Sequence, residues 1–271
     1  MPELPEVETV RKVLKKNLIG LKIDSLIVNY PSMIKTDLTE FNNLLGEEIK
    51  DIKRYGKWLV FITTNYCLVS HLRMEGKYFY VPILDMNKHD QIIFKLNNGY
   101  YLKYNDVRKF GVMYLVKPDK LFIDTPLKDL GLEPFSKELT SSYLLSKFKI
   151  KKTPIKTILL DQSIITGIGN IYADEILFKS RIFPLKKANL LNESECLKII
   201  NNTKEILEEA ISLGGTTIRS YTSSLGVKGS YQTKLLVHTK TNCPLCNKKL
   251  EVIKIGGRST YYCSNCQVQD E

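Results

Sequence analysis

Four of the six cysteines form two Cys-x2-Cys pairs, Cys243 with Cys246 and Cys263 with Cys266. Two such pairs at this separation can place four thiolates around one tetrahedral zinc ion. Four protein ligands leave no open position on the metal, so the single ion would be structural and would carry out no chemistry. Two disulfide bonds are the alternative, but we find no export signal in the sequence and adopt zinc.

A second group of residues that could do chemistry follows Met1, where Pro2 is flanked by the carboxylates Glu3 and Glu6. Removal of Met1 would convert the Pro2 nitrogen from a tertiary amide into a secondary amine, which can attack the anomeric carbon of a sugar. The carboxylates would lie at a helix N-terminus, where the helix dipole favours negative charge. Pro-Glu is also simply a good helix start, and these residues alone favour that plainer interpretation.

The hydrophobic pattern predicts the elements that position these residues. Apolar residues recur every three or four positions over 4–18, which predicts an amphipathic helix. From residue 21 to about 117 the pattern changes to short β-rich runs, and Asn98-Gly99 marks a hairpin turn between two of them. The expected strands are Leu21–Val28, Trp58–Thr63, Cys67–Leu72, Lys77–Val81, Gln91–Leu96, Tyr100–Tyr104 and Val112–Val116. The sequence therefore predicts an antiparallel sandwich or barrel with a helix packed on it.

Beyond a linker rich in proline and glycine the pattern becomes helical, with helices expected at 137–150, 155–161, 171–179 and 193–213. The domain boundaries that we predict are 1–130 for the β-domain, 131–150 for the linker and first helix, 151–233 for the helical domain and 234–271 for the zinc finger. The fold class is thus α+β with two domains and a four-cysteine finger.

The charge of the chain points to a polyanion as partner. The formal net charge is +11 and the sequence pI is about 9.2, and the excess of bases is spread along the whole chain. The composition, 43% hydrophobic and 25% charged, excludes disordered, collagen-like and coiled-coil classes. No apolar stretch approaches the ~18 residues of a membrane-spanning helix. We therefore expect a cytoplasmic protein with no membrane partner.

Several motifs of this chain, and their order, closely resemble those of the bacterial formamidopyrimidine-DNA glycosylases. The blocks that carry the resemblance are Met1-Pro-Glu-Leu-Pro-Glu-Val-Glu-Thr9, Gly56-Lys57, His71-Leu-Arg-Met-Glu-Gly76, Lys88-His-Asp90, Asp106-Val-Arg-Lys-Phe-Gly111, Gly167-Ile-Gly-Asn-Ile-Tyr-Ala-Asp-Glu175, Gly214-Gly-Thr-Thr217 and the four cysteines. Leu4 favours this branch over the related endonuclease VIII enzymes for oxidised pyrimidines, which usually have glycine there. An endonuclease VIII-like glycosylase for oxidised pyrimidines stays the nearest alternative.

The resemblance implies a β-sandwich that carries the active site, then a helical domain with a helix-two-turns-helix motif and a zinc hairpin. It also implies an enzyme of base excision repair that everts and excises oxidised purines, such as 8-oxoguanine and formamidopyrimidines, from duplex DNA. The enzyme would then cut abasic sites by β,δ-elimination, as an apurinic/apyrimidinic-site lyase. The residues that it implies for this chemistry are Pro2 as nucleophile, Glu3 as general acid and base, Glu6 as organiser of the site, and Lys57 beside the reacting sugar.

The resemblance further implies a set of side chains that bind DNA. Met74, Arg108 and Phe110 would fill the space left by the everted base, a task suited to apolar wedges with one arginine. The residues implied to contact the DNA backbone are His71, His89, Lys156, Asn170 and Arg258. We expect a monomer that binds double-stranded DNA containing oxidised bases or abasic sites.

Plainer roles exist for several of these residues. Each histidine could be structural, Asn170 could be a helix N-cap, and Arg258 could be a solvated charge at a hairpin tip. The segment from His238 to Asn242 departs from the family's Tyr-Gly-Arg-x-Gly pattern, and the loop 216–232 matches it only in part. A zinc-finger protein that binds nucleic acid without catalysis, or a ribosome-associated zinc protein, are the other hypotheses.

Overall fold

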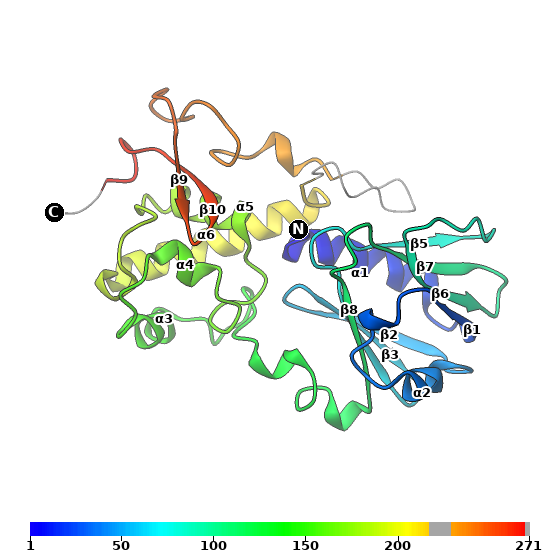
Figure 1. Cartoon of the computed structure of the whole chain (residues 1–271). Helices are drawn as coiled ribbons and strands as arrows, with labels where there is room; N and C mark the ends of the chain where they lie inside the picture. Colours follow the sequence, from blue (N-terminus) through cyan, green and yellow to red (C-terminus); the bar gives the residue numbers. More distant parts are fainter. Residues whose placement is uncertain (217–228, 269–271) are drawn as a thin grey trace. The chain divides into compact units, whose positions relative to one another are not determined.

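The computed structural model describes residues 1–216 and 229–268, which form two compact units (Figure 1). The first unit comprises Met1–Lys128 together with the described residues of Gly214–Ser230. The second comprises Asp129–Leu213 and the described residues from Tyr231 onward. The segment that starts at Gly214 thus has its contacts with the β-rich unit, although its sequence follows the last long helix. Among the described residues, no helix is long and apolar enough to span a bilayer.

Two antiparallel four-stranded sheets build the first unit. One sheet has the order β1-β6-β7-β5 and the other β2-β3-β4-β8. The strand bounds are β1 Ile23–Val28, β2 Ile49–Tyr55, β3 Trp58–Thr63, β4 Cys67–His71, β5 Lys77–Val81, β6 Asp90–Leu96, β7 Tyr101–Asn105 and β8 Val112–Val116. Apolar side chains of both sheets meet in one core that includes Phe61, Phe94 and Tyr104. The expected sandwich and its α+β class are confirmed.

The helix α1, Leu4–Leu18, packs against β2 and β3 through its apolar stripe. Leu4, Val7, Val10, Leu14 and Leu18 are all at most 4% exposed. Burial of each such side chain contributes roughly 1.5–3 kcal/mol, so the start of this helix is held firmly on the sandwich. Its first residues include those that could do chemistry. The shorter helices of this unit are α2 Leu38–Phe41, η1 Pro31–Met33, η2 Asn42–Leu44 and η3 Pro118–Lys120, and η4, Pro126–Asp129, lies at the boundary with the second unit.

The second unit is helical and ends in a β-hairpin. Its long helix α6, Glu193–Ser212, contacts α3, Ser141–Phe148, and α5, Asn170–Lys179. The other helices are α4 Ile155–Leu159, η5 Ala188–Leu190 and η6 Tyr231–Thr233. The hairpin strands β9, Glu251–Ile255, and β10, Arg258–Tyr262, turn through Gly256 and Gly257 at positive φ, and β10 lies against α5 (Figure 1).

One strand of the sandwich was not predicted. The strand β2 has the sequence IKDIKRY, in which four residues are charged and a register shift between Ile49 and Asp51 places the buried Ile49 and Ile52 three positions apart. Charged side chains on the outer face of a sheet do not prevent pairing, because only one face meets the core. The helix expected at 137–150 is shorter, because Thr140 caps it and the helix therefore begins at Ser141.

Candidate active site and nucleic-acid interface

The start of α1 gathers the predicted catalytic residues in one buried place. Pro2 is buried, Glu3 is 2% exposed and Glu6 is 6% exposed. The Glu6 side chain turns back to the N-cap, where its Oε2 accepts the Glu3 N–H at 2.8 Å, in a capping-box arrangement. Glu6 thereby fixes the backbone that joins Glu3 to Pro2.

The same Glu6 carboxylate also holds the segment that follows α6. Its Oε1 accepts both the Thr216 N–H at 2.8 Å and the Thr216 hydroxyl at 3.0 Å. Gly215 has φ +78°, and a Cβ there would lie 2.6 Å from Glu6 Oε1. Glycine is required for both reasons. The described part of this block, Gly214-Gly-Thr216, therefore closes on the start of α1. Thr217, the last residue of the block, lies outside the described residues.

Lys57 lies in the tight turn between β2 and β3 and is 5% exposed. The turn is fixed by Arg54, whose Nη1 donates to the Gly56 carbonyl at 2.9 Å. Arg54 also pairs with Glu8 of α1 at 3.1 Å. Burial would raise the pKa of the Glu8 carboxyl, but Arg11 and Arg54 outweigh it and lower that pKa. Helix α1 and the Lys57 turn are thus joined by an ion pair.

His71 ends β4 with its ring packed against Trp58, at 4.5 Å between centroids. Its Nδ1 accepts the Arg73 N–H at 2.9 Å, so Nδ1 carries no proton. Burial, with the charges of Arg73 and Lys57, lowers the pKa of His71 to about 3. The ring is therefore neutral near pH 7, and its proton is on Nε2, which can only donate. A neutral donor beside two cations is suited to an anionic oxygen.

Two loops carry the three residues predicted to fill the DNA stack, and both pack on Tyr104. Met74 is 38% and Phe110 50% exposed, so both side chains are accessible to a partner. A Cβ on Gly76 would lie 2.2 Å from the Tyr104 hydroxyl, and one on Gly111 would lie 1.9 Å from it. The loops therefore close on the same buried hydroxyl, which brings them together on one side of the sandwich.

The loop of Arg108 and Phe110 is organised by Asp106, which is fully buried. Its carboxylate accepts the N–H groups of Arg108 at 3.0 Å and of Gly111 at 2.8 Å, and the Arg108 guanidinium lies 4.7 Å from the centre of the Phe110 ring. The backbone of His89 joins this loop, since its carbonyl accepts the Asp106 N–H at 2.9 Å. Asp106 and Tyr104 position the loop but were not singled out from the sequence; the glycines of the two motif blocks are the signal for them.

The second unit holds the other predicted DNA ligands. Gly169 is the N-cap of α5 and Asn170 is its first residue, so Asn170 is not itself the cap. Arg258 is exposed at the start of β10, next to the glycine turn. Lys156, in contrast, is fully buried and ion-paired with Asp174 at 2.5 Å. An ammonium group so enclosed meets no phosphate unless the surrounding structure moves.

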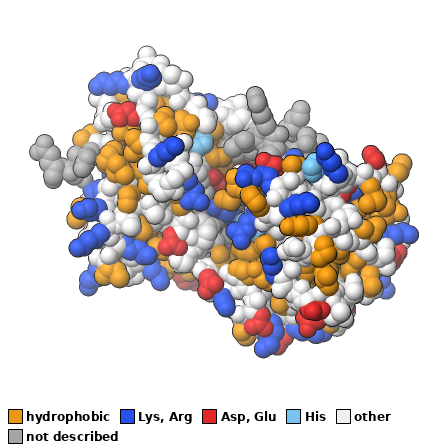
Figure 2. Space-filling model, in the orientation of Figure 1, with side chains coloured by type: hydrophobic (Ala, Val, Ile, Leu, Met, Phe, Trp, Pro, Cys, Tyr) orange, Lys and Arg blue, Asp and Glu red, His pale blue; other side chains and the backbone are white. Residues whose placement is uncertain are grey.

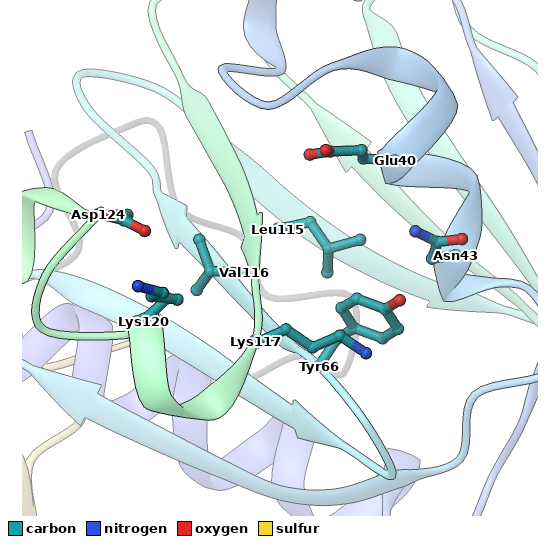
Figure 3. A pocket seen from close by; sticks show the side chains of 8 residues that line it. All are labelled: Glu40, Asn43, Tyr66, Leu115, Val116, Lys117, Lys120 and Asp124. Atoms are coloured by element: carbon teal, nitrogen blue, oxygen red, sulfur yellow. The ribbon is translucent and has the colours of Figure 1, made fainter.

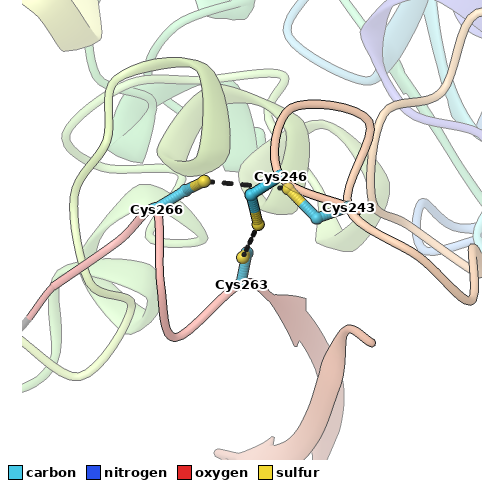
Figure 4. A group of neighbouring side chains, drawn as sticks. All are labelled: Cys243, Cys246, Cys263 and Cys266. Atoms are coloured by element: carbon cyan, nitrogen blue, oxygen red, sulfur yellow. Dashed lines mark hydrogen bonds between the residues drawn. The ribbon is translucent and has the colours of Figure 1, made fainter. Parts of the chain in front are cut away.

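The four cysteines of the second unit converge as predicted (Figure 4). Their Sγ atoms all lie within 4.8 Å of one another, with Cys243 to Cys266 at 3.8 Å and Cys246 to Cys263 at 3.5 Å. A tetrahedron with Zn–S bonds of about 2.3 Å has edges of about 3.8 Å, so the donor set fits one metal ion of this kind. Gln267 supports the cluster: it accepts the Cys263 N–H and donates to the Ile182 carbonyl.

A cavity of about 260 Å³ lies elsewhere on the first unit, between η3 and α2 (Figure 3). Its lining residues are Glu40, Asn43, Tyr66, Leu115, Val116, Lys117, Lys120 and Asp124. It contains none of the predicted site residues, and the Lys117 ammonium lies over the Tyr66 ring, 3.8 Å from its centre. The predicted site residues of the first unit lie instead in loops and at the N-terminus, which is the form of an exposed interface rather than of a small-molecule pocket.

The sandwich with its N-terminal site and the helical unit with its cysteine finger match the domains of a class of DNA glycosylases. Models of the formamidopyrimidine-DNA glycosylase N-terminal domain match residues 1–113, the H2TH domain of the same enzymes matches 130–222, and the zinc finger found in FPG and IleRS matches 243–268. The chain belongs to the formamidopyrimidine-DNA glycosylase family.

Relatives of similar length support this membership. The formamidopyrimidine-DNA glycosylase of Streptococcus pneumoniae is 44% identical over the full length of both chains, and that of Bacillus cereus is 45% identical over 98% of this chain and 99% of its own. The Lactococcus lactis enzyme is 40% identical. Its structure as the G226P mutant with Fapy-dG DNA has a TM-score of 0.93 and covers 99% of this chain and 100% of its own. Its complex with abasic-site DNA has a TM-score of 0.92, with 98% and 100% covered.

Proposed function

We propose that the protein is a bifunctional DNA glycosylase and abasic-site lyase that removes oxidised purines from duplex DNA. The observation that carries this proposal is the buried start of α1, where Glu6 holds the backbone between Pro2 and Glu3 in a fixed conformation. The substrates that we propose are formamidopyrimidines and 8-oxoguanine. Fapy-dG DNA and abasic-site DNA are the ligands of the Lactococcus lactis enzyme in its solved complexes.

The proposed reaction begins after removal of Met1. The Pro2 nitrogen attacks C1′ of the damaged nucleotide, the C1′–N glycosidic bond breaks, and the base leaves with the bonding electrons and takes up a proton. The Pro2 nitrogen then loses its proton, the C1′–O4′ bond breaks and O4′ takes up a proton, so the ring-opened sugar becomes an iminium on Pro2. Loss of a C2′ proton breaks the C3′–O bond, and a second elimination breaks the C5′–O bond. The covalent intermediate divides one difficult step into easier ones.

Glu3 is the general acid and base in this proposal. Glu3 directly follows Pro2, so its carboxylate would lie beside the reacting sugar, whereas the Glu6 carboxylate holds the Glu3 N–H and Thr216. Lys57 and the Nε2–H of His71 would hold the phosphate beside the reacting sugar, and His89 a neighbouring one. Met74, Arg108 and Phe110 would enter the stack, because apolar side chains on loops can replace the everted base.

Contacts to the bases alone would not hold the duplex. We propose that the positive charge of the protein binds the phosphate backbone of the DNA. Figure 2 shows Lys and Arg side chains over both units. Neutralised phosphates make affinity fall with salt, at a log-log slope near −0.9 for each phosphate. We propose Asn170 and Arg258 as backbone ligands in the second unit, a monomeric enzyme, and action in the cytoplasm.

The four cysteines would hold one structural Zn²⁺. The sulfur spacing fits a tetrahedral ion, and the small core beside the cluster, with Phe178, Val237 and Leu250, is too small to stabilise the finger alone. Zinc binding can supply on the order of 10 kcal/mol to such a fold. No coordination position would remain for substrate.

Borohydride trapping tests the proposal. With duplex DNA containing 8-oxoguanine or a formamidopyrimidine, reduction should give a covalent complex whose adduct maps to Pro2 by mass spectrometry. Pro2→Gly should lose base excision and the proline adduct while it keeps its affinity for abasic-analogue DNA. Glu3→Gln should lower excision by at least 100-fold. An adduct on another residue, or full excision by Pro2→Gly, would show the mechanism to be wrong.

A further inference from the structure

A single buried carboxylate links three segments of the second unit. Asp174 lies one turn after Asn170 on α5 and is 1% exposed. Its Oδ1 accepts from Lys156 Nζ at 2.5 Å, and its Oδ2 lies 2.7 Å from His238 Nδ1. Lys156 belongs to α4, whereas His238 belongs to the segment that leads to the zinc finger. Helix α5 is thus tied to both through one side chain.

The same lysine reaches the hairpin strand. Lys156 Nζ lies 3.4 Å from the Ser259 carbonyl, which also accepts Asn170 Nδ2 at 3.0 Å. Ser259 directly follows Arg258 in β10. One carbonyl therefore joins the backbone of Arg258 to the Asn170 side chain, and Lys156 connects this carbonyl to Asp174.

Glu175 directly follows Asp174 and holds the backbone of the segment that leads to the zinc finger. Its carboxylate accepts the N–H groups of Leu236, Val237 and His238 at 2.6, 3.0 and 2.8 Å. Burial raises the pKa of the Glu175 carboxyl, and the three N–H groups offset only part of this rise. The His238 ring also packs against Tyr261 of β10, at 5.0 Å between centroids. His238 is therefore held from α5 and from β10 together.

We propose that Asp174 is a positioning residue for DNA binding, which through Lys156 and His238 sets the places of Asn170 and Arg258. The inference rests on the proposed function of this unit in binding duplex DNA. A buried ion pair is a poor source of stability, because the desolvation of both charges offsets their attraction. The pair instead fixes positions, because removal of the Asp174 carboxylate would release Lys156 and His238, which both contact the hairpin strand β10.

The alternative is that Lys156 itself binds a phosphate, and the sign of one substitution separates the two roles. Asp174→Asn removes a negative charge and frees the Lys156 ammonium. If Lys156 were a direct phosphate ligand, the variant should bind DNA more tightly, because a competing carboxylate is gone. If Asp174 positions Asn170 and Arg258, the variant should bind more weakly in spite of its more positive charge.

The test uses the full-length, zinc-loaded protein and a duplex with a stable abasic-site analogue, with binding measured at several salt concentrations. We expect Asp174→Asn to bind about 10-fold more weakly and to lose about 0.9 from the log-log salt slope, the contribution of one phosphate. Single-turnover cleavage of lesion DNA at saturating enzyme should stay within about twofold, because the chemistry belongs to the first unit. Affinity that is unchanged or higher would overturn the inference.

A loss of folding is separated from a loss of position by a second variant. Lys156→Met with Asp174→Asn removes both charges, so no unpaired ammonium stays buried. This double variant should melt close to wild type but keep the weak binding. Addition of Arg258→Ala should then weaken DNA binding by the double variant less than it weakens DNA binding by wild type, because coupled residues do not act additively. Full recovery of affinity, or additive effects, would contradict the positioning role.

Glu205→Gln is the matched control, since it removes a carboxylate that pairs with Lys179 at the far end of α5. It should bind DNA as wild type does. Failure of the proposed function gives a different result from failure of this inference. In the first case wild type itself binds abasic-analogue duplex no better than undamaged duplex. In the second, wild type discriminates between them and Asp174→Asn binds as tightly as wild type.

Discussion

At the scale of single residues, the first unit buries polar groups whose states are set by their neighbours. Glu6 is an acceptor for three donors from two segments, so it organises the start of α1. His71 is held neutral with its proton on Nε2. The family resemblance points to both residues, but the hydrogen bonds from Thr216 to Glu6 join positions 210 residues apart and leave no local sequence pattern.

His71 leads to a prediction about pH. Its folded-state pKa, about 3, lies below the value near 6.5 of an unfolded histidine. Below pH 6.5 the unfolded chain therefore binds a proton that the folded protein does not. The free energy of unfolding should fall by up to about 1.4 kcal/mol per pH unit between pH 6.5 and 3 from this residue.

Urea denaturation of wild type and His71→Gln at pH 7.5 and 5.5 measures this effect. The loss of stability between the two pH values should be smaller in the variant by about 1 kcal/mol. Equal losses in both proteins would mean that His71 takes up its proton in the folded state.

At the scale of elements, Tyr104 in β7 determines how two loops meet. Gly76 and Gly111 belong to two of the sequence motifs, and the Tyr104 hydroxyl between them is the reason that both positions need glycine. Gly111→Ala should force the loop of Arg108 and Phe110 outward. Overpacking of this kind costs about 1–3 kcal/mol, and affinity for abasic-analogue DNA should fall about 10-fold because Phe110 is displaced.

Thermal melting and fluorescence anisotropy measure the two effects. Gly99→Ala is the control: Gly99 has φ +85° and nothing within 4 Å of its would-be Cβ, so this variant carries only backbone strain. It should lose some stability and keep its DNA affinity. If Gly111→Ala binds DNA as Gly99→Ala does, the Tyr104 contact does not position the wedge loop.

At the scale of the whole molecule, periodicity and spacing predicted most of the fold. The helix 4–18 and three strands have the expected bounds, because each has a clear apolar face and the core selects that face. The strand Ile49–Tyr55 was missed because four of its residues are charged and a register shift after Ile49 breaks the alternation. The burial of Lys156 was missed too, since its partner Asp174 is eighteen residues away and lysine is seldom buried. Long-range pairing of polar residues leaves no local pattern.

Zinc is the last feature that acts at this scale, because a metal would hold the final segment of the chain together. Chelation should unfold the β9–β10 hairpin and weaken binding to abasic-analogue DNA at least 10-fold, since Arg258 and Ser259 would lose their place, and added Zn²⁺ should restore it. The single tryptophan, Trp58, lies in the first unit and reports on it separately, so its fluorescence should not change. Cys243→Ser should reproduce the loss, whereas Cys196→Ala, at a buried cysteine of α6 outside the cluster, should bind DNA normally. DNA affinity and resistance to proteolysis that survive chelation would mean that the finger folds without metal.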